Sequence, residues 1–314
     1  MEKRFYSVSD FYKKRFGTKV FKISLDAGCT CPTRDGTKGR GGCIFCSAAG
    51  SGDFAASRMK PIHEQIGQAK QLVESKLRGR SGTTDGRFIA YFQNFTNTYG
   101  EPSVLEQKYC EAAAEPGIVG IAIATRPDCL DDGILNRIAR LGDRTFVSIE
   151  LGLQTSNETT AAFIRRGYPL STYDAAVQRI RRANPAIHIV THVIFGLPGE
   201  TDADMLETVR HCTAAGTDGI KFTVLYVLAG TDLAAGYRAG SFSCMTQDDY
   251  FSIVARSLEL LPPSVVVHRL TGDGPKRILI APLWTANKRK VRNDMARYFT
   301  AHDVRQGSAE QISR

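Results

Sequence analysis

Short apolar runs rich in β-forming residues alternate along most of this chain with longer segments whose apolar residues have helical spacing. In one such segment Ile62, Ile66, Ala69 and Val73 recur three or four residues apart, as on one face of a helix. Strands that alternate with helices in this way predict βαβ units and a parallel sheet. The expected strands are 20–25, 88–93, 119–124, 145–151, 187–195 and 220–226.

Six such units predict an α/β fold, a partial (β/α)6 TIM-like barrel with N- and C-terminal extensions. The expected division is an N-terminal extension over 1–19, the barrel over 20–244 and a basic extension packed on the barrel over 245–314. This last part is expected to contain a helix that ends near Leu261, a strand over 265–268 and a basic helix over 286–299.

A glycine-rich segment after the first expected strand, CPTRDGTKGRGGCIFC, carries three cysteines at a C-x11-C-x2-C spacing. These are Cys31, Cys43 and Cys46. Thiolates bind iron–sulfur clusters, zinc or copper, and a [4Fe-4S] cube normally takes four of them. Three thiolates therefore predict a cube with one iron left open to a substrate or cofactor.

A structural zinc site is the alternative for the same segment, because Cys29 offers a fourth thiolate in a C-x-C and C-x2-C arrangement. If the segment binds a cluster instead, Cys29 is expected to be a buried thiol without a ligand role. For Cys129 and Cys244 the sequence leaves both packing and a functional role open.

Unusual polar or glycine motifs follow the expected strands. After the cysteine segment they are QNFTNTYG, TRPDCL, ELGLQT, FGLPGET and LAGTDL. Active sites of such barrels form at the carboxyl ends of the strands, so these motifs predict one site on one rim. Glu150 is a strong candidate, since a carboxylate within an apolar strand requires a partner or a functional role.

These motifs together resemble the radical S-adenosylmethionine (SAM) superfamily, and within it the group of the bacterial proteins YhcC and YtqA, which is related to the elongator catalytic subunit. The resemblance runs from SLDAG through the cysteine segment, YFQNFTNTYG, TRPDCL, SIELGLQT and HVIFGLPGET to RLTGD and APLW near the end. The first cysteine gap is longer than the usual CxxxCxxC of the superfamily, as it is in the subgroup of the elongator subunit.

The resemblance implies two cofactors, a [4Fe-4S] cluster held by Cys31, Cys43 and Cys46 and a SAM molecule whose adenine lies beside Phe45. The other implied SAM contacts are Gln93, Asn94 and Thr96 at the methionine group, Glu150 and Gln154 at the ribose or carboxylate, and Ile194, Gly196 and Glu200 at the adenine. The second-strand motif lacks the GGE sequence of many members. Alternatively, Gln93 and Asn94 could brace loops, and Gly196 could belong to a tight turn.

The implied reaction begins with electron transfer from the cluster to SAM, which gives methionine and a 5′-deoxyadenosyl radical that removes a hydrogen atom from the substrate. An electron donor such as flavodoxin or ferredoxin is expected. No single catalytic side chain is assigned. The start of the chain is not a secretory signal and no stretch has the length of a membrane span, so the cytoplasm is the expected compartment and no membrane partner is expected.

The chain is basic, with 41 Lys and Arg against 32 Asp and Glu, a formal charge of +9 and a pI of about 9.2. This suits an anionic partner such as nucleic acid, although charge runs are often only solvated surface. Basic clusters include Arg165 with Arg166, Arg179 with Arg181 and Arg182, Lys276 with Arg277, and the run from 288 to 292, with Trp284, Tyr298 and Phe299 near it as possible base-stacking aromatics.

We therefore expect tRNA as the substrate, and the resemblance implies the wobble-uridine side chain, in steps toward 5-methylaminomethyluridine from its carboxymethylated form. The candidate substrate contacts are Arg126, Asp128, Arg269, Lys288, Arg289, Lys290 and Arg292. Arg126 and Asp128 could equally form an ion pair at the rim. Two alternatives stay open, a radical SAM enzyme that acts on a small molecule or peptide and a noncatalytic zinc or iron–sulfur protein that binds nucleic acid.

Overall fold

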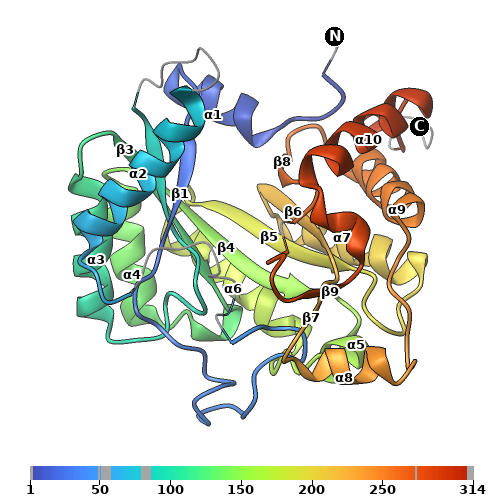
Figure 1. Ribbon diagram of the computed structural model, residues 1–314. Helices are drawn as coiled ribbons and strands as arrows, with labels where there is room; N and C mark the ends of the chain where they lie inside the picture. The colour runs from blue at the N-terminus through green and yellow to red at the C-terminus, as the bar shows by residue number, and fades with distance from the viewer. Residues whose placement is uncertain (1–2, 49, 51–57, 79–85, 273, 310–314) are drawn as a thin grey trace.

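The centre of the molecule is a parallel sheet of seven strands in the order β1-β2-β3-β4-β5-β6-β8 (Figure 1). The computed structural model describes residues 3–48, 50, 58–78, 86–272 and 274–309. The sheet curves into a half-barrel, which confirms the predicted partial TIM-like barrel. Its strands are β1 (Phe21–Leu25), β2 (Phe88–Phe92), β3 (Ile118–Thr125), β4 (Phe146–Gln154), β5 (His188–Phe195), β6 (Gly219–Val224) and β8 (Val266–Arg269).

The connecting helices pack on the outer face of the sheet (Figure 1). The α-helices are α1 (Val8–Phe16), α2 (Ile62–Arg78), α3 (Pro102–Ala114), α4 (Asp132–Gly142), α5 (Glu158–Phe163), α6 (Leu170–Ala183), α7 (Asp202–Ala215), α8 (Asp232–Arg238), α9 (Gln247–Leu260) and α10 (Lys288–Ala301). Within the described residues, no helix combines the length and apolar character that crossing a bilayer requires.

The sheet has one strand more than the six expected in the barrel. The strand expected in the C-terminal extension, β8, pairs in parallel with β6 and so completes the sheet. The sixth strand ends two residues earlier than expected, at Val224, and a separate short strand, β7 (Val227–Leu228), pairs antiparallel with β9 (Leu279–Ala281). The C-terminal part of the chain thus contributes to the site edge of the sheet.

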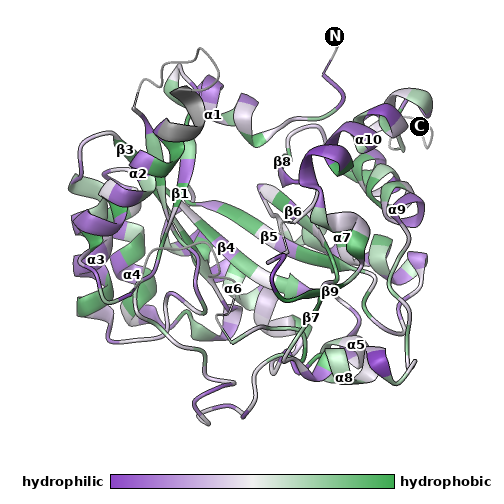
Figure 2. Cartoon of the chain, viewed as in Figure 1, coloured by the Kyte–Doolittle hydropathy of each residue, from purple (hydrophilic) through white to green (hydrophobic). Residues whose placement is uncertain are grey.

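Alternate residues of each strand face the helices and the inside of the half-barrel. In β2, Phe88 and Phe92 belong to the core between sheet and helices, whereas Ile89 and Tyr91 face inward. The strands are accordingly rich in hydrophobic residues, green in Figure 2. At the amino ends of the strands α1 fills the inside, and its Phe11 ring stacks on His188 with a centroid distance of 4.6 Å. The carboxyl ends are therefore the side where a site can form.

We expect replacement of Ile149 in β4 by Ala to lower the free energy of unfolding by about 2–5 kcal/mol, because it removes close-packed apolar volume and leaves a cavity. Ile149 is 0% exposed in the main core. The control is Val104→Ala on α3, where the side chain is 47% exposed and a change below about 0.5 kcal/mol is expected. Urea denaturation followed by circular dichroism measures both, and equal losses would contradict the placement of Ile149.

Candidate functional site

Two adjoining cavities lie at the carboxyl ends of the barrel strands. The first contains the three cysteines in its lining, and the second, with a volume of about 340 Å³, extends over the ends of β5 and β6. Both are lined by Phe45, Cys46, Gly50, Gln93, Gln154, His192 and Arg269. Five of the six motifs predicted to meet on one rim contribute residues to these walls, whereas no residue of FGLPGET lines either cavity.

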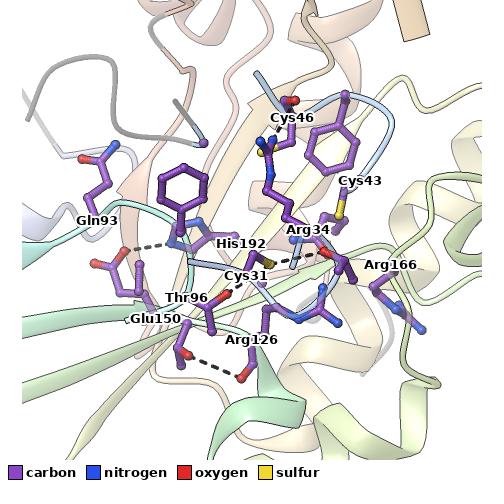
Figure 3. Close-up of a pocket in the computed structure, with 18 of the residues that line it drawn as sticks. Cys31, Arg34, Cys43, Cys46, Gln93, Thr96, Arg126, Glu150, Arg166 and His192 are labelled. Carbon is purple, nitrogen blue, oxygen red and sulfur yellow. Dashed lines mark hydrogen bonds and ion pairs between the residues drawn. The ribbon is translucent and has the colours of Figure 1, made fainter. Parts of the chain in front are cut away.

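Cys31, Cys43 and Cys46 gather around the first cavity (Figure 3). The hydroxyl of Thr96, after β2, donates to Cys31 Sγ at 3.3 Å. Burial raises the pKa of Cys43 to about 12, and the nearby Cys46 and Cys31 add to this effect. In the described part of the chain no three His, Cys, Asp or Glu side chains converge closely enough for a single metal ion. The three thiols thus surround a space rather than a point.

Arg34 holds the cysteine segment in its folded form. Its guanidinium donates to the carbonyl oxygens of Cys46 and Ser47 at 3.0 and 2.5 Å. Gly42 has a φ of 72°, and a Cβ there would lie 3.0 Å from Arg34 Nε. A glycine is therefore required where the segment folds back over the arginine.

Cys29 lies apart from the other three cysteines. Its side chain is buried in the main core with Leu25 and Ala27 and lines neither cavity. Burial raises the pKa of Cys29 to about 11, and the charged groups that act on it are Lys108, Asp26 and Arg58 rather than other thiols. This position does not suit the fourth ligand of a zinc site.

Two of the residues predicted after β2, Gln93 and Asn94, have different surroundings. Gln93 lines both cavities and accepts a hydrogen bond from the Ser24 hydroxyl at 3.0 Å. Asn94 lines neither, and its amide donates to Asp26 Oδ2 at 2.5 Å. Since Asp26 Oδ1 accepts from the Gly28 N–H at 2.7 Å, Asn94 braces the turn that leads into the cysteine segment.

Glu150 has no solvent-exposed side-chain surface and is surrounded by basic side chains. Lys22 Nζ lies 2.5 Å from its Oε1, and Lys221 contacts Oε2. His192 Nε2 lies 2.8 Å from Oε2 (Figure 3). Desolvation alone would raise the pKa of Glu150, but Lys22, Lys221 and His192 outweigh it and hold the pKa well below its usual range. The carboxylate is therefore ionised.

Lys22 and Lys221 are site residues that the sequence prediction missed. Each stands inside an apolar strand, in FKISL and GIKFTV, at a position that faces inward. That a charged residue interrupts an apolar strand is the signal that could have identified them, as it did Glu150.

The end of β4 is irregular where it enters the site. The β4–β5 register shifts between Gly152 and Gln154, and Gln154 has a φ of 66°. Arg166 lies beneath this end, 1% exposed, and donates to the carbonyl oxygens of Leu153 and Thr155. The expectation that Arg166 belongs to a basic surface is therefore wrong, because its guanidinium is used to hold the backbone of this loop.

Ile194 at the end of β5 lines the second cavity, whereas Gly196 and Glu200 line neither. A Cβ on Gly196 would lie 2.7 Å from Met245 Cγ, so glycine is needed for the close approach of the C-terminal part. Glu200 accepts a hydrogen bond from Thr155 through Oε1, while its buried Oε2 has no partner among the described residues. Burial raises the pKa of Glu200 to about 7.

The candidate substrate residues lie in two groups. Arg126 lines the first cavity and forms an ion pair with Asp128 through two hydrogen bonds, at 2.9 and 3.1 Å. This is the rim ion pair that was expected as an alternative to a substrate contact. Arg269 lines both cavities and Lys288 the second. The side chains of Lys288, Arg289, Lys290 and Arg292 are exposed on the first turns of α10.

Several other cations of the predicted basic surface have acidic partners. Arg165, Arg179 and Arg181 pair with Asp232, Asp132 and Asp218 at 2.5, 2.6 and 2.5 Å. These pairs reduce the charge available to a ligand, so α10 is the stronger basic surface.

The aromatic residues near α10 are part of the packing of this region rather than exposed stacking surfaces. Trp284 packs on Tyr250, with its indole N–H donated to the Met245 carbonyl at 3.1 Å, and Phe299 is buried. Tyr298 stacks on His302 at 4.0 Å. The expectation that these rings stack on bases is not supported by their surroundings.

Cys129 and Cys244 line neither cavity. Cys129 is buried, and burial raises its pKa to about 12. Cys244 is partly buried against an apolar cluster that includes Leu197 and Leu233. Both positions agree with a packing role.

Two family models match almost the whole length of the chain beyond the first strand. The Radical SAM superfamily model matches residues 36–212, and the Radical_SAM C-terminal domain model matches residues 217–300. The chain belongs to the radical SAM superfamily. It is 42% identical to YtqA of Bacillus subtilis (strain 168) over 92% of this chain and 88% of that protein. It is 36% identical to YhcC of Escherichia coli (strain K12) over 94% and 92%. The expected relation to the YhcC and YtqA group is confirmed.

The expected relation to the elongator catalytic subunit is supported by Elongator complex protein 3 of Schizosaccharomyces pombe, which is 27% identical over 79% of this chain and 51% of that protein. The archaeal Elp3 of Methanocaldococcus infernus superposes with a TM-score of 0.66 over 91% of this chain and 64% of that chain, at 15% identity. A protein of Methanocaldococcus jannaschii named tRNA uridine(34) acetyltransferase is 23% identical over 77% of this chain and 45% of its own length. The structural likeness concerns the fold.

Radical SAM family membership implies SAM and a [4Fe-4S] cluster, and the donor set at the first cavity fits a cluster. The three thiols line the first cavity, and Arg34, Arg126 and Arg166 line the same cavity. Soft sulfur ligands select such clusters, and nearby cations offset the negative charge of thiolates. The hydroxyl of Thr96 supplies a hydrogen bond to one of the sulfurs.

Glu200→Gln is expected to raise stability in a pH-dependent manner. The folded-state pKa of Glu200, about 7, lies above its ordinary value of 4.5, so the stability that the neutral carboxyl provides is fully present below pH 4.5 and is lost as the pH rises through 7. The Gln variant should match the wild type in melting temperature near pH 4.5 and exceed it at pH 8. Glu207→Gln, on the exposed side of α7, is the control and should show no such trend. If the melting temperatures of the Gln variant and the wild type differed by the same amount at all pH values, the buried neutral carboxyl would be refuted.

Proposed function

We propose that this radical SAM enzyme modifies tRNA, and that it acts on the wobble-uridine side chain in a step toward 5-methylaminomethyluridine from its carboxymethylated form. The observation that carries the proposal is the continuity of the cysteine-lined cavity with a second cavity whose wall includes Lys288 of the basic helix α10. A substrate bound along α10 can thus present one side chain to the cofactor site.

Cys31, Cys43 and Cys46 are proposed to hold the cluster. When bound, the cluster and SAM together supply a one-electron reduction that releases methionine and a 5′-deoxyadenosyl radical. Arg34 and Thr96 hold the cysteine segment and one sulfur in position. Flavodoxin or ferredoxin remains the predicted electron donor.

The proposed SAM contacts fall into those that line the second cavity and those that position them. Phe45, Gln93, Gln154 and Ile194 line it. Glu150 lines only the first cavity, and it orients His192, which lines both. We propose that Asn94, Gly196 and Glu200 act indirectly by holding the turns that carry these residues.

The tRNA part of the proposal is supported by a charge pattern and by relatives. Lys288, Arg289, Lys290 and Arg292 are exposed on α10, where they can neutralise backbone phosphates. Lys290 is 2.6 Å from Asp294, so it is the weakest of these candidates. A relative of the chain bears the name tRNA uridine(34) acetyltransferase, which is an enzyme of the same substrate class.

Each alternative has a distinguishing observation. A radical SAM enzyme for a small molecule or peptide would show no salt-dependent affinity for tRNA, because binding through phosphate contacts must weaken as salt rises. A noncatalytic zinc protein would need a fourth ligand, and the Cys29 thiol is packed in the core. We therefore favour the tRNA-modifying enzyme.

We expect Cys31→Ala, Cys43→Ala and Cys46→Ala each to abolish cluster binding, because the cube would retain only two protein ligands. Cys29→Ala is the matched control and should retain it. Anaerobic reconstitution followed by iron and sulfide analysis and by the visible absorbance spectrum measures cluster content. Loss of the cluster in the Cys29 variant alone would overturn the assignment of ligands.

Deletion of the gene for this protein should change the modified nucleosides of tRNA at the wobble uridine. The carboxymethylated precursor should accumulate and the product should fall. Mass spectrometry of nucleosides from deletion and wild-type cells measures both, with complementation by the Cys43→Ala variant as a control that should not restore the product. Unchanged wobble uridines would remove this substrate.

A further inference from the structure

Five charged or titratable side chains form a layer across the inner face of the half-barrel. They are Lys22 of β1, Glu150 of β4, His192 of β5, Lys221 of β6 and Arg269 of β8. In the sheet register His192 is opposite Lys221, and Lys221 is opposite Arg269. His192, Lys221 and Arg269 therefore lie side by side on neighbouring strands, and His192 and Arg269 reach the walls of both cavities.

This layer contains more positive than negative charge. Glu150 is the single carboxylate, and it is already engaged by Lys22 at 2.5 Å and by Lys221. Burial lowers the pKa of His192 to about 4, and Lys221 adds to this, so the imidazole is neutral near pH 7. Lys22 and Arg269 are thus two cations against one carboxylate, and Lys221 is a further basic group beside them. Burial also lowers the pKa of Lys221 well below its usual range. The charges of Lys22 and Arg269 lower this pKa further, whereas Glu150 acts in the opposite direction.

Arg269 is the cation that is left without an anion. Among the residues that the structure describes, no hydrogen bond or ion pair to its guanidinium is found, although it is only partly exposed. A guanidinium presents a planar fork of donors that matches a carboxylate with two parallel hydrogen bonds. Because Arg269 lines both cavities, its guanidinium N–H donors are available to a ligand that enters the site.

Arg269 also lies on the path from the surface to the site. A groove between α1 and α10 is lined by Phe5, Val8, Met295 and Phe299, and Arg269 and Lys288 line both this groove and the second cavity. Exposed Arg292 lines the outer part of the groove. The cations of α10 therefore lead to Arg269 at the inner end.

We propose that Arg269, with Lys221 behind it, binds a carboxylate at the end of the substrate side chain and so makes the enzyme specific for an acidic modified nucleoside. This inference rests on the proposed function, in which the wobble-uridine side chain is carboxymethylated. A carboxylate bound there supplies the second anion that the layer lacks. It also places the carbons next to that carboxylate in the cavity that adjoins the three thiols.

The test compares two anticodon stem-loop RNAs that differ in one negative charge and one methyl group. One carries 5-carboxymethylaminomethyluridine at the wobble position, and the other carries its methyl ester. We expect the cluster-loaded wild-type enzyme with SAM to bind the acid roughly tenfold more tightly than the ester, as a charge-assisted hydrogen bond implies. In Arg269→Gln the ratio of the affinity for the acid to the affinity for the ester should fall to near one, and in Arg269→Lys this ratio should be intermediate.

Arg144→Gln is the matched control, because Arg144 is exposed just before β4, at the opposite end of the barrel. It should keep the full ratio. Iron content and melting temperature establish that each variant is folded and loaded.

Three results would overturn the carboxylate site. The first is a wild-type enzyme that does not distinguish acid from ester. The second is an Arg269→Gln variant that weakens both RNAs equally, which would make Arg269 a phosphate contact. The third is a variant that weakens SAM binding and keeps the ratio, which would make Arg269 a contact of the methionine carboxylate.

Failure of the proposed function gives a different result, because binding is measured apart from turnover. An enzyme that discriminates acid from ester through Arg269 and yet leaves the wobble nucleoside unmodified would retain the carboxylate site and refute the reaction.

Discussion

The ion pairs of Glu150 with Lys22 and Lys221 allow the inside of this half-barrel to be polar. In a closed TIM barrel the interior is filled by layers of apolar side chains. Here charged side chains from β1, β4 and β6 meet at the same level, and loss of one partner of such a buried pair typically costs about 3–5 kcal/mol. Because the carboxylate is held ionised, it fixes two lysines and His192 beneath the site.

Two arginines, the partly buried Arg34 and the buried Arg166, hold the loops above this layer. Arg34 binds carbonyl groups at the end of the cysteine segment, and Arg166 binds carbonyl groups after β4. Both use a donor fork that can join separate stretches of backbone. The loops that carry the cysteines and Gln154 thereby gain fixed positions without regular secondary structure. This is the preorganisation that a cofactor site requires.

Much of the fold and part of the site could be predicted from sequence. Apolar periodicity identified the strands to within a few residues, and the cysteine spacing with the strand-end motifs identified the family. Periodicity could not assign β8 to the sheet, because pairing with β6 is decided by contacts distant in sequence. Arg166 shows the same limit. The pair Arg165 and Arg166 suggests an exposed basic surface from the sequence, but the fold buries Arg166.

The sequence by itself determined the α/β alternation, the three thiols and the order in which the strand-end motifs occur. These features depend on local propensity and on residue spacing, both of which can be determined from the sequence alone. Only the tertiary structure decided that Cys29 is a core residue, that Asn94 braces a turn, and that Lys22, Lys221 and Arg269 share one layer with Glu150. Burial and charge balance depend on which strands become neighbours, and Lys22 and Glu150, 128 positions apart, meet only when the sheet curves.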